Sequence, residues 1–221
     1  MEIDLSRPIL ERNDTLAAAN RAALAAAGTF ALDVLASPGA GKTTTILATL
    51  AVLGERFRTA VIEGDIASRV DAEKVKASGI MAVQINTGGA CHLEADMVSR
   101  ALDALPLDEL DLVVIENVGN LVCPIEFDLG QSARIVIASV PEGDDKPLKY
   151  PSIFAIADAV LLNKVDAAAA FDFDEAAFTE GVRALNGIAP IFRVSAKTGE
   201  GIGEWAEWLA DRVKAARDRA G

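Results

Sequence analysis

The feature that most constrains the fold of this chain is a glycine-containing loop, SPGAGKT at residues 37–43, between two apolar segments. The loop follows a strand-like run that begins at residue 30, and it opens a segment that is typical of a helix as far as residue 53. Its spacing matches a phosphate-binding P-loop, except that Ala36 stands where the pattern has its first glycine. A chance glycine-rich turn is the alternative, but the Gly-Lys-Thr-Thr text at the expected offset favours the P-loop.

The residue types in this loop explain how it would hold phosphate groups. Gly39 and Gly41 allow the backbone to curl so that its N–H groups, together with the helix N-terminus, face an anion. Lys42 is placed to reach the β- and γ-phosphates, and the Thr43 hydroxyl is placed to ligate Mg²⁺. The residues expected to contact the phosphates are Gly39, Ala40, Gly41, Lys42, Thr43 and Thr44.

Length and charge limit the classes of protein to which this chain belongs. Its 221 residues suffice for one large α/β domain. No run approaches the ~20 apolar residues of a membrane span. The first residues are charged and lack the apolar core of a signal peptide, so we expect a cytoplasmic protein without a membrane partner. The net charge of −12 argues against a nucleic-acid partner, because neutralising phosphates requires clustered Lys and Arg.

The order of helix-like and strand-like segments predicts an α/β fold. An Ala-rich helix is expected over residues 14–27, ending at Gly28 and lying on the domain surface. Apolar, β-rich runs then alternate with helix-like stretches, which predicts a mostly parallel sheet with helices on both faces. The runs lie at residues 59–65, 81–86, 111–119, 133–140, 158–166 and 190–196; helices are expected to start near 68–71 and to cover about 202–219, where Trp205, Trp208, Leu209 and Val213 would face the core.

Candidate functional residues follow the predicted strands, at the sheet edge where α/β proteins bind ligands. Glu116 ends the run DLVVIE, and its carboxylate would hold a Mg²⁺-bound water. Gly119, three residues later, would bring its N–H to the γ-phosphate. Asp65 ends another run and is a second candidate for the metal or the attacking water. A carboxylate in a solvated turn is the alternative for both acidic residues.

A second group of residues predicts recognition of guanine. Asp166 in the text NKVD can accept hydrogen bonds from N1–H and the 2-amino group of guanine, whereas adenine presents an acceptor and a C–H there. A site built around such a buried polar group rejects the mismatched base, because the group would be left unpaired. Asn163 and Lys164 belong to the same motif, and Lys164 would lay its methylenes on the base. Ser195, Ala196 and Lys197 would offer a backbone N–H to its O6. These motifs in this order predict a GTPase that converts GTP to GDP and phosphate.

The two cysteines and the single histidine suggest a second metal site. Cys91, His92 and Cys123 all follow predicted strands at the same edge of the sheet. Thiolate and imidazole ligands suit Zn²⁺ or Ni²⁺. Inert thiols beside a surface histidine are the alternative. Three ligands do not complete a tetrahedral or square-planar set, so water, a carboxylate such as Glu94 or Glu126, or a second chain would be needed.

Taken together, these motifs resemble those of the HypB family, the GTPases that assist nickel insertion into [NiFe]-hydrogenase. The resemblance extends from Leu32 to Trp208, and it is carried by VIEGDIASRVDAEKV, QINTGGACHLEADMV, VVIENVGNLVCPIEFDLG, VPEGDDKPLKYP and LLNKVD. It implies a P-loop GTPase domain over residues 29–221, preceded by a short helical extension over residues 1–28. It also implies a GTP-dependent homodimer with a metal site at or near the interface, using Cys91, His92 and Cys123. Hydrogenase maturation proteins and the large subunit of the hydrogenase are the implied partners.

The sequence departs from many members of that family at its N-terminus. It has no cysteine motif near Met1 and no histidine-rich tract, so we expect no nickel capture or storage by an N-terminal segment, which leaves the Cys/His site in the GTPase domain as the only nickel site. Lys146 lies in another family-like loop and would either reach a nucleotide in the partner chain or belong to a solvated loop. Three alternative functions stay open. The protein could be a urease-type or cobalamin-enzyme accessory GTPase, a metabolic P-loop kinase, or a GTP-binding metal sensor or scaffold with little turnover.

Overall fold

The sheet of this protein has seven strands, and every neighbouring pair is parallel. The computed structural model describes residues 7–64 and 79–220. The strand order is β3-β2-β4-β1-β5-β6-β7, which places β1 in the centre, between β4 and β5. The mostly parallel sheet predicted from the sequence is therefore confirmed. The strands are β1 (Phe30–Ala36), β2 (Thr59–Glu63), β3 (Met81–Gln84), β4 (Leu112–Glu116), β5 (Ala133–Ser139), β6 (Ala159–Asn163) and β7 (Ile191–Arg193).

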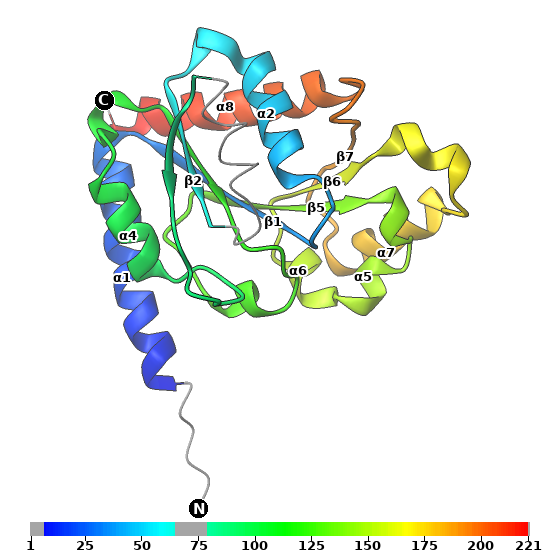
Figure 1. Ribbon diagram of the computed structural model, residues 1–221, viewed down its shortest axis with the longest axis horizontal. Coiled ribbons are helices and arrows are strands. Elements are labelled where there is room, and N and C mark those ends of the chain that lie inside the picture. The colour runs from blue at the N-terminus through cyan, green and yellow to red at the C-terminus, as the bar shows by residue number, and fades with distance from the viewer. Residues whose placement is uncertain (1–6, 65–78, 221) are drawn as a thin grey trace, which may run out of the picture.

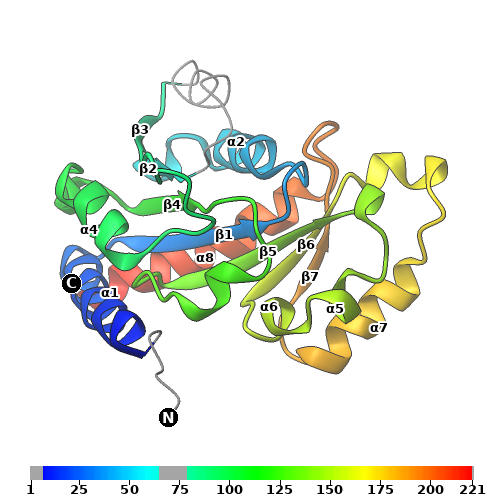
Figure 2. The ribbon, with the colours of Figure 1, turned by 60° about the horizontal axis from the view of Figure 1, so that its bottom comes forward.

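Helices cover both faces of the sheet, as Figures 1 and 2 show. Helices α2 and α8 pack on one face, while α1 and α4 lie side by side on the other, with α6 and α7 further along it. The helices are α1 (Arg7–Ala27), α2 (Lys42–Leu53), α4 (Ala95–Asp103), α5 (Lys146–Lys149), α6 (Pro151–Ala155), α7 (Glu175–Leu185) and α8 (Ile202–Ala220); short 3₁₀ turns are η1 (Gly54–Arg56), η2 (Leu107–Glu109), η3 (Cys123–Glu126), η4 (Val140–Glu142) and η5 (Val165–Ala170).

Side chains of β1 alternate between the two apolar layers, as the pleat of a strand requires. Leu32 and Val34 pack in the layer beneath α2 and α8. On α8, Trp205, Leu209 and Val213 are buried in the same layer, and Trp208 packs partly buried against it, as the helical spacing predicted. The centre of the sheet is thus buried on both sides, and the candidate functional side chains lie mainly in the loops that follow the strands.

The N-terminal helix is longer than the sequence pattern predicted. It begins at Arg7 rather than near residue 14, and it ends before Gly28 as expected. Pro8 lies in the first turn, where the missing N–H of proline leaves no hydrogen bond unmade, so proline does not exclude the earlier start. The helix packs along α4, and the division of the chain at residue 28 stays a prediction.

Two other boundaries differ from the sequence prediction or fall outside the described residues. The second strand ends at Glu63 instead of residue 65. The helix expected to start at 68–71 lies outside the described residues, and so does Asp65. Within the described ranges, no helix has the length and apolar character needed to cross a membrane.

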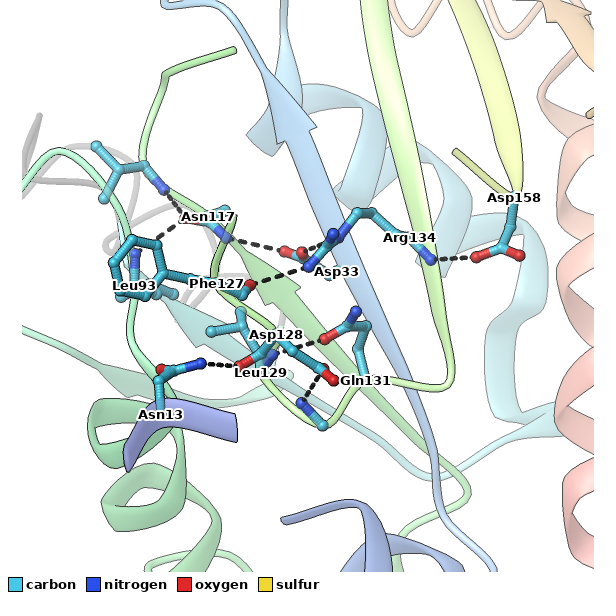
Figure 3. Close-up of polar contacts among 12 residues, drawn as sticks. Asn13, Asp33, Leu93, Asn117, Phe127, Asp128, Leu129, Gln131, Arg134 and Asp158 are labelled. Carbon is cyan, nitrogen blue, oxygen red and sulfur yellow. Dashed lines mark hydrogen bonds and ion pairs between the residues drawn. The ribbon is translucent and has the colours of Figure 1, made fainter. Parts of the chain in front are cut away.

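One polar cluster lies inside the face covered by α1 and α4. Asp33 of β1 and Arg134 of β5 stand opposite one another in the strand register, and they form an ion pair with a distance of 3.1 Å. Asp33 is completely buried, and Asn117, just after β4, donates to its other carboxylate oxygen at 3.0 Å (Figure 3). On the same face of β1, Ala31 belongs to one apolar cluster and Leu35 to another. The polar groups around Asp33 lie between these two clusters.

Candidate functional site

The loop that joins β1 to α2 has the backbone conformation of a phosphate cradle. Gly39 and Gly41 both have positive φ, 77° and 97°, and Gly41 directly precedes the helix. A β-carbon on Gly41 would lie 2.7 Å from the amide nitrogen of Asn163, so this glycine is required by close packing as well as by its backbone angle. Ala36 is the last residue of β1 and is buried. A small residue suffices at that position, because an extended strand conformation does not need a glycine.

The segment predicted to recognise guanine is bonded to the phosphate loop and to the start of α2. Asn163 Nδ2 donates to the carbonyl of Ala40 at 2.9 Å and to Thr45 Oγ1 at 3.2 Å. Lys164, whose φ is 62°, donates through Nζ to the carbonyl of Gly39 at 2.6 Å. The loops after β1 and β6 are therefore held as one unit, so a base bound by one would be fixed relative to phosphates bound by the other.

The acidic end of β4 meets the start of α2. Thr43 Oγ1 donates to Glu116 Oε1 at 2.7 Å. A β-carbon on Gly119 would lie 3.2 Å from Lys42 Nζ and from Pro38 Cα, so the loop after β4 passes directly over the phosphate loop. A larger residue at Gly119 would push these two loops apart. Four of the sequence-predicted residues thus converge here, whereas Asp65, the fifth, lies outside the described residues.

The loop after β7 holds the carboxylate that is expected to read the base. Ser195 Oγ donates to Asp166 Oδ1 at 2.7 Å. The Ala196 N–H donates to Asn163 Oδ1 at 3.2 Å. Hydrogen bonding of guanine O6 to that N–H would require this contact to be shared or exchanged.

Lys146 lies against the phosphate loop of its own chain. Its Nζ donates to Ser37 Oγ at 3.2 Å and pairs with Glu142 Oε1 at 3.2 Å. Its side chain is 15% exposed, so most of this side chain is buried in the structure. A contact with a nucleotide in a partner chain stays a prediction.

The two cysteines and the histidine form a compact cluster. The potential ligand atoms of Cys91, His92 and Cys123 all lie within 4.8 Å of one another. Cys91 and His92 belong to the loop between β3 and α4, and Cys123 begins η3 after β4. The carboxylates of Glu94 and Glu126 are not part of this group. Two thiols and one imidazole are a donor set that suits Zn²⁺ or Ni²⁺.

The environment of the cluster sets the protonation of its members. Burial lowers the pKa of His92, although the Glu94 carboxylate acts in the opposite direction. The imidazole is therefore kept neutral, as a ligand must be. A hydrogen bond with the neighbouring Cys123 thiol, together with burial, raises the pKa of Cys91. A metal ion would therefore have to displace a proton from this thiol.

Neighbouring residues orient the histidine. The His92 ring stacks on Phe127, with 3.9 Å between ring centroids. His92 Nδ1 lies 3.6 Å from Cys91 Sγ, so this side of the ring faces the cluster. Within the part of the chain that the structure describes, His92 Nε2 has no hydrogen-bond partner, and its nearest carboxylate is Glu94 Oε1 at 3.8 Å. Nδ1 is thus the His92 nitrogen that is placed to bind a metal ion.

Sequence reasoning missed several polar and aromatic residues that contact the immediate neighbours of this cluster or, for Phe127, the His92 ring itself. Asn117, Asp33 and Arg134 were not among the candidates, and neither was Phe127. The sequence did carry a sign of them, because Asp33 interrupts the apolar run FALDVLA and Arg134 is the second residue of ARIVIASV, a run that is otherwise mostly apolar. A charge within a buried strand needs a partner, but the sequence does not show which residue supplies it.

Comparison with known proteins identifies the family. The family described as "CobW/HypB/UreG, nucleotide-binding domain" matches residues 32–193. The hydrogenase maturation factor HypB of Azotobacter chroococcum is 48% identical over 99% of this chain and 71% of that protein. The hydrogenase/urease maturation factor HypB of Helicobacter pylori is 40% identical over 96% of this chain and 89% of that protein.

A solved structure agrees in fold as well. The crystal structure of HypB from Helicobacter pylori in complex with nickel superposes with a TM-score of 0.87 at 40% identity, covering 92% of this chain and 96% of that one. The P-loop fold and the family resemblance predicted from the sequence are confirmed. Because the agreement in sequence and in fold extends over almost the whole chain, this protein belongs to the HypB family.

Proposed function

We propose that this protein is a GTP-hydrolysing metallochaperone that assists nickel insertion into [NiFe]-hydrogenase. GTP would promote a homodimer, and dimerisation would be coupled to the Cys91, His92 and Cys123 site. The observation that carries this proposal is the position of the cluster formed by the Cys91, His92 and Cys123 side chains. Cys123 belongs to the same loop as Gly119, which lies against the phosphate loop, so one segment borders both sites.

The nucleotide part of the proposal rests on side chains that converge on the phosphate loop. Lys42 and the backbone N–H groups around Gly39 and Gly41 would bind the phosphates, and Asp166 would select guanine. Thr43 Oγ1 and Glu116 Oε1 are oxygen donors of the kind that Mg²⁺ prefers, and they lie 2.7 Å apart. Mg²⁺ held by these residues would neutralise charge that develops on the phosphate oxygens.

The dimer part of the proposal rests on the number of metal ligands. Three donors per chain leave a four-coordinate metal incomplete. Two chains that meet at this edge would supply six donors, and a symmetric contact would bring each cluster to its counterpart. The nickel named for the Helicobacter pylori structure supports Ni²⁺ as the cargo. Zn²⁺ fits the same donor set.

Two other functions are distinguished by specific observations. The name of the Helicobacter pylori relative includes urease, which supports a urease-type accessory GTPase as the second candidate. A metal sensor or scaffold would use the same sites without appreciable turnover. Steady-state hydrolysis of GTP, measured with and without Ni²⁺, separates a sensor from an enzyme, and transfer of ⁶³Ni to purified hydrogenase or urease precursor separates the two maturation functions.

Sedimentation velocity tests the coupling of nucleotide, metal and dimer. The protein is measured with GDP or with a non-hydrolysable GTP analogue, each with and without Ni²⁺. We expect a dimer with the analogue, and we expect Ni²⁺ to bind more tightly there than with GDP. Since linkage is reciprocal, Ni²⁺ must tighten binding of the analogue by the same factor, typically ~5- to 150-fold for coupled sites. A protein that stays monomeric in all four conditions contradicts the proposal.

A further inference from the structure

The buried ion pair between Asp33 and Arg134 has no part in the nucleotide or metal chemistry described above. Its side chains are 0% and 10% exposed, so both charges are removed from water. A buried ion pair contributes little net stability, because desolvation offsets the attraction between the charges. The pair therefore calls for another explanation, and its contacts with neighbouring segments provide one.

Asn117 connects this ion pair to the loop after β4. Its Nδ2 donates to Asp33 Oδ1 at 3.0 Å, and its Oδ1 accepts from the N–H groups of Val118 and Leu93 at 2.9 and 3.2 Å. The residue is 1% exposed. Because Glu116 precedes it, any shift of the end of β4 moves an amide that is also bonded to the metal-binding loop (Figure 3).

Leu93 links Asn117 to the Cys91, His92 and Cys123 cluster. It directly follows His92 in the chain, and it is completely buried. A β-carbon on Gly64 would lie 2.6 Å from the Leu93 side chain, so that side chain packs against the backbone at the end of β2. The backbone N–H of Leu93 is thus bonded to Asn117, and its side chain is packed against Gly64. Because His92 is the preceding residue in the chain, a displacement of the Leu93 backbone would also move His92.

A second chain of contacts leads from Asp33 to His92 through Arg134 and Phe127. Arg134 Nε donates to Asp33 Oδ2 at 3.1 Å, and Arg134 Nη2 donates to the carbonyl of Phe127 at 3.0 Å. The Phe127 ring is the one that stacks on His92. Arg134 therefore joins β5 to the residue beneath the imidazole, and Figure 3 shows both arms meeting at Asp33.

We propose that Asn117 is a positioning residue that couples the nucleotide site to the metal site, with Asp33 and Arg134 as its anchor. The proposal rests on the proposed function, since it assigns residues to the coupling between GTP and metal. When the loop containing Glu116 and Gly119 shifts on nucleotide exchange, Asn117 moves Leu93 and thereby changes the place of His92 relative to Cys123. Asn117 contacts neither ligand, and its effect is on the ratio of metal affinities in the two nucleotide states.

The test exchanges two side chains that are nearly the same size. Asn117→Asp alone places two carboxylates against each other, and Asp33→Asn alone leaves Arg134 beside a neutral group. The double variant restores an amide–carboxylate hydrogen bond in the reversed sense, and it keeps acceptors for Leu93 N–H and for Arg134. Ni²⁺ affinity is measured by chelator competition with GDP and with a non-hydrolysable GTP analogue, and the ratio of the two affinities is the coupling factor.

We expect each single variant to lower the coupling factor at least ~5-fold toward 1, and we expect the double variant to recover most of it. Arg134→Lys keeps a positive charge near Asp33, but its single ammonium nitrogen replaces the two separate guanidinium nitrogens that bond Asp33 and the Phe127 carbonyl, so it should lower the factor as well. Asn186→Ala is the matched control. Asn186 is also buried and bonded to several backbone groups, but these belong to α6, the residues after it and the turn before β7, away from both sites. Thermal unfolding identifies variants that do not fold.

The outcomes separate this proposal from the proposed function. A wild-type coupling factor of 1 contradicts the coupling of GTP and metal itself, and with it this inference. A wild-type factor above 1 that persists in Arg134→Lys and in the folded exchange variants overturns the role of Asn117 alone. If a single variant does not fold, the double variant and Arg134→Lys still decide. A loss of coupling in Asn186→Ala as large as in the Asn117 and Arg134 variants would also overturn it, because general destabilisation would then account for the effect.

Discussion

The hydroxyl of Ser195 donates a 2.7 Å hydrogen bond to Oδ1 of Asp166, so two motifs that are separated in the chain fix one carboxylate. Ser195 is completely buried, and its oxygen also accepts from the N–H of Thr198 at 3.1 Å. The carboxylate is thereby oriented before any base arrives. An acceptor held in this way would bind a base without the cost of ordering the carboxylate on binding.

The first prediction concerns the base. Asp166→Asn should abolish the preference for GTP and favour xanthosine triphosphate, because an amide can donate to the carbonyl that replaces the guanine 2-amino group. Competition of both nucleotides for the metal-free protein measures the preference, and a change of roughly 10⁴-fold in relative affinity is the upper range for such a contact. Asp108→Asn, at the opposite end of the sheet, is the control. A variant that still prefers GTP would show that Asp166 does not read the base.

The second prediction concerns phosphate chemistry. Lys42→Ala and Thr43→Ala should each lower GTP turnover by about 10²-fold or more while the fold stays intact, because both side chains act where charge develops. Thr43→Ser is the matched control, since it keeps the hydroxyl that lies 2.7 Å from Glu116. Single-turnover hydrolysis and circular dichroism report the two properties. Unchanged turnover in both alanine variants would refute the assignment of the P-loop.

The third prediction concerns the metal ligands. Replacing Cys91, His92 or Cys123 singly should weaken Ni²⁺ and Zn²⁺ binding by at least about 10-fold. GTP affinity of the metal-free protein should stay unchanged, because the three residues are expected to contact the metal and not the phosphates. Isothermal titration measures both affinities. Stoichiometric metal in the triple variant would place the site elsewhere.

The fourth prediction concerns pH. Burial lowers the pKa of His92, whereas the Cys123 thiol and burial raise the pKa of Cys91. Because the pKa of His92 lies below its usual value of ~6.5, the imidazole is mostly neutral between about pH 6.5 and 8.5, and metal binding there releases mainly thiol protons. Ni²⁺ affinity should rise with pH across this range. Cys91→Ser should flatten the slope, and His92→Gln should weaken binding while leaving the slope. The opposite pattern would assign the released proton to the imidazole.

The fifth prediction concerns the docking of the N-terminal helix. Gly130 has a φ of 85°, and a β-carbon there would lie 2.5 Å from the carbonyl oxygen of Ala17 in α1. Gly130→Ala should therefore lower the free energy of unfolding by about 1–3 kcal/mol or more, through backbone strain and overpacking. Gly199→Ala has the same φ of 85° and no atom within 4 Å of the added carbon, so it measures the strain alone. Equal losses in urea denaturation would mean that the contact with α1 contributes nothing.

The parts of this site that depend on local sequence could be predicted, and those that depend on strand pairing could not. The P-loop and the NKVD segment are short motifs, and Cys91, His92 and Cys123 could be placed at one edge because parallel strands end together. The bond from Asn163 to Ala40 joins residues far apart in the chain. The pair of Asp33 with Arg134 requires the register between β1 and β5, which no local pattern reveals. Charges inside apolar strands indicate that such partners exist without naming them.

The position of β3 at the edge of the sheet has a mechanical consequence. This strand pairs with β2 alone among the described strands, and none of its four residues is fully buried. Cys91 follows β3, whereas Cys123 follows β4, on the far side of β2. A metal ion held by both thiols would fasten the least protected strand to the interior of the sheet. The bound metal ion would then stabilise the pairing of β3, so amide hydrogen exchange in β3 would slow when the metal binds and become faster when it is released.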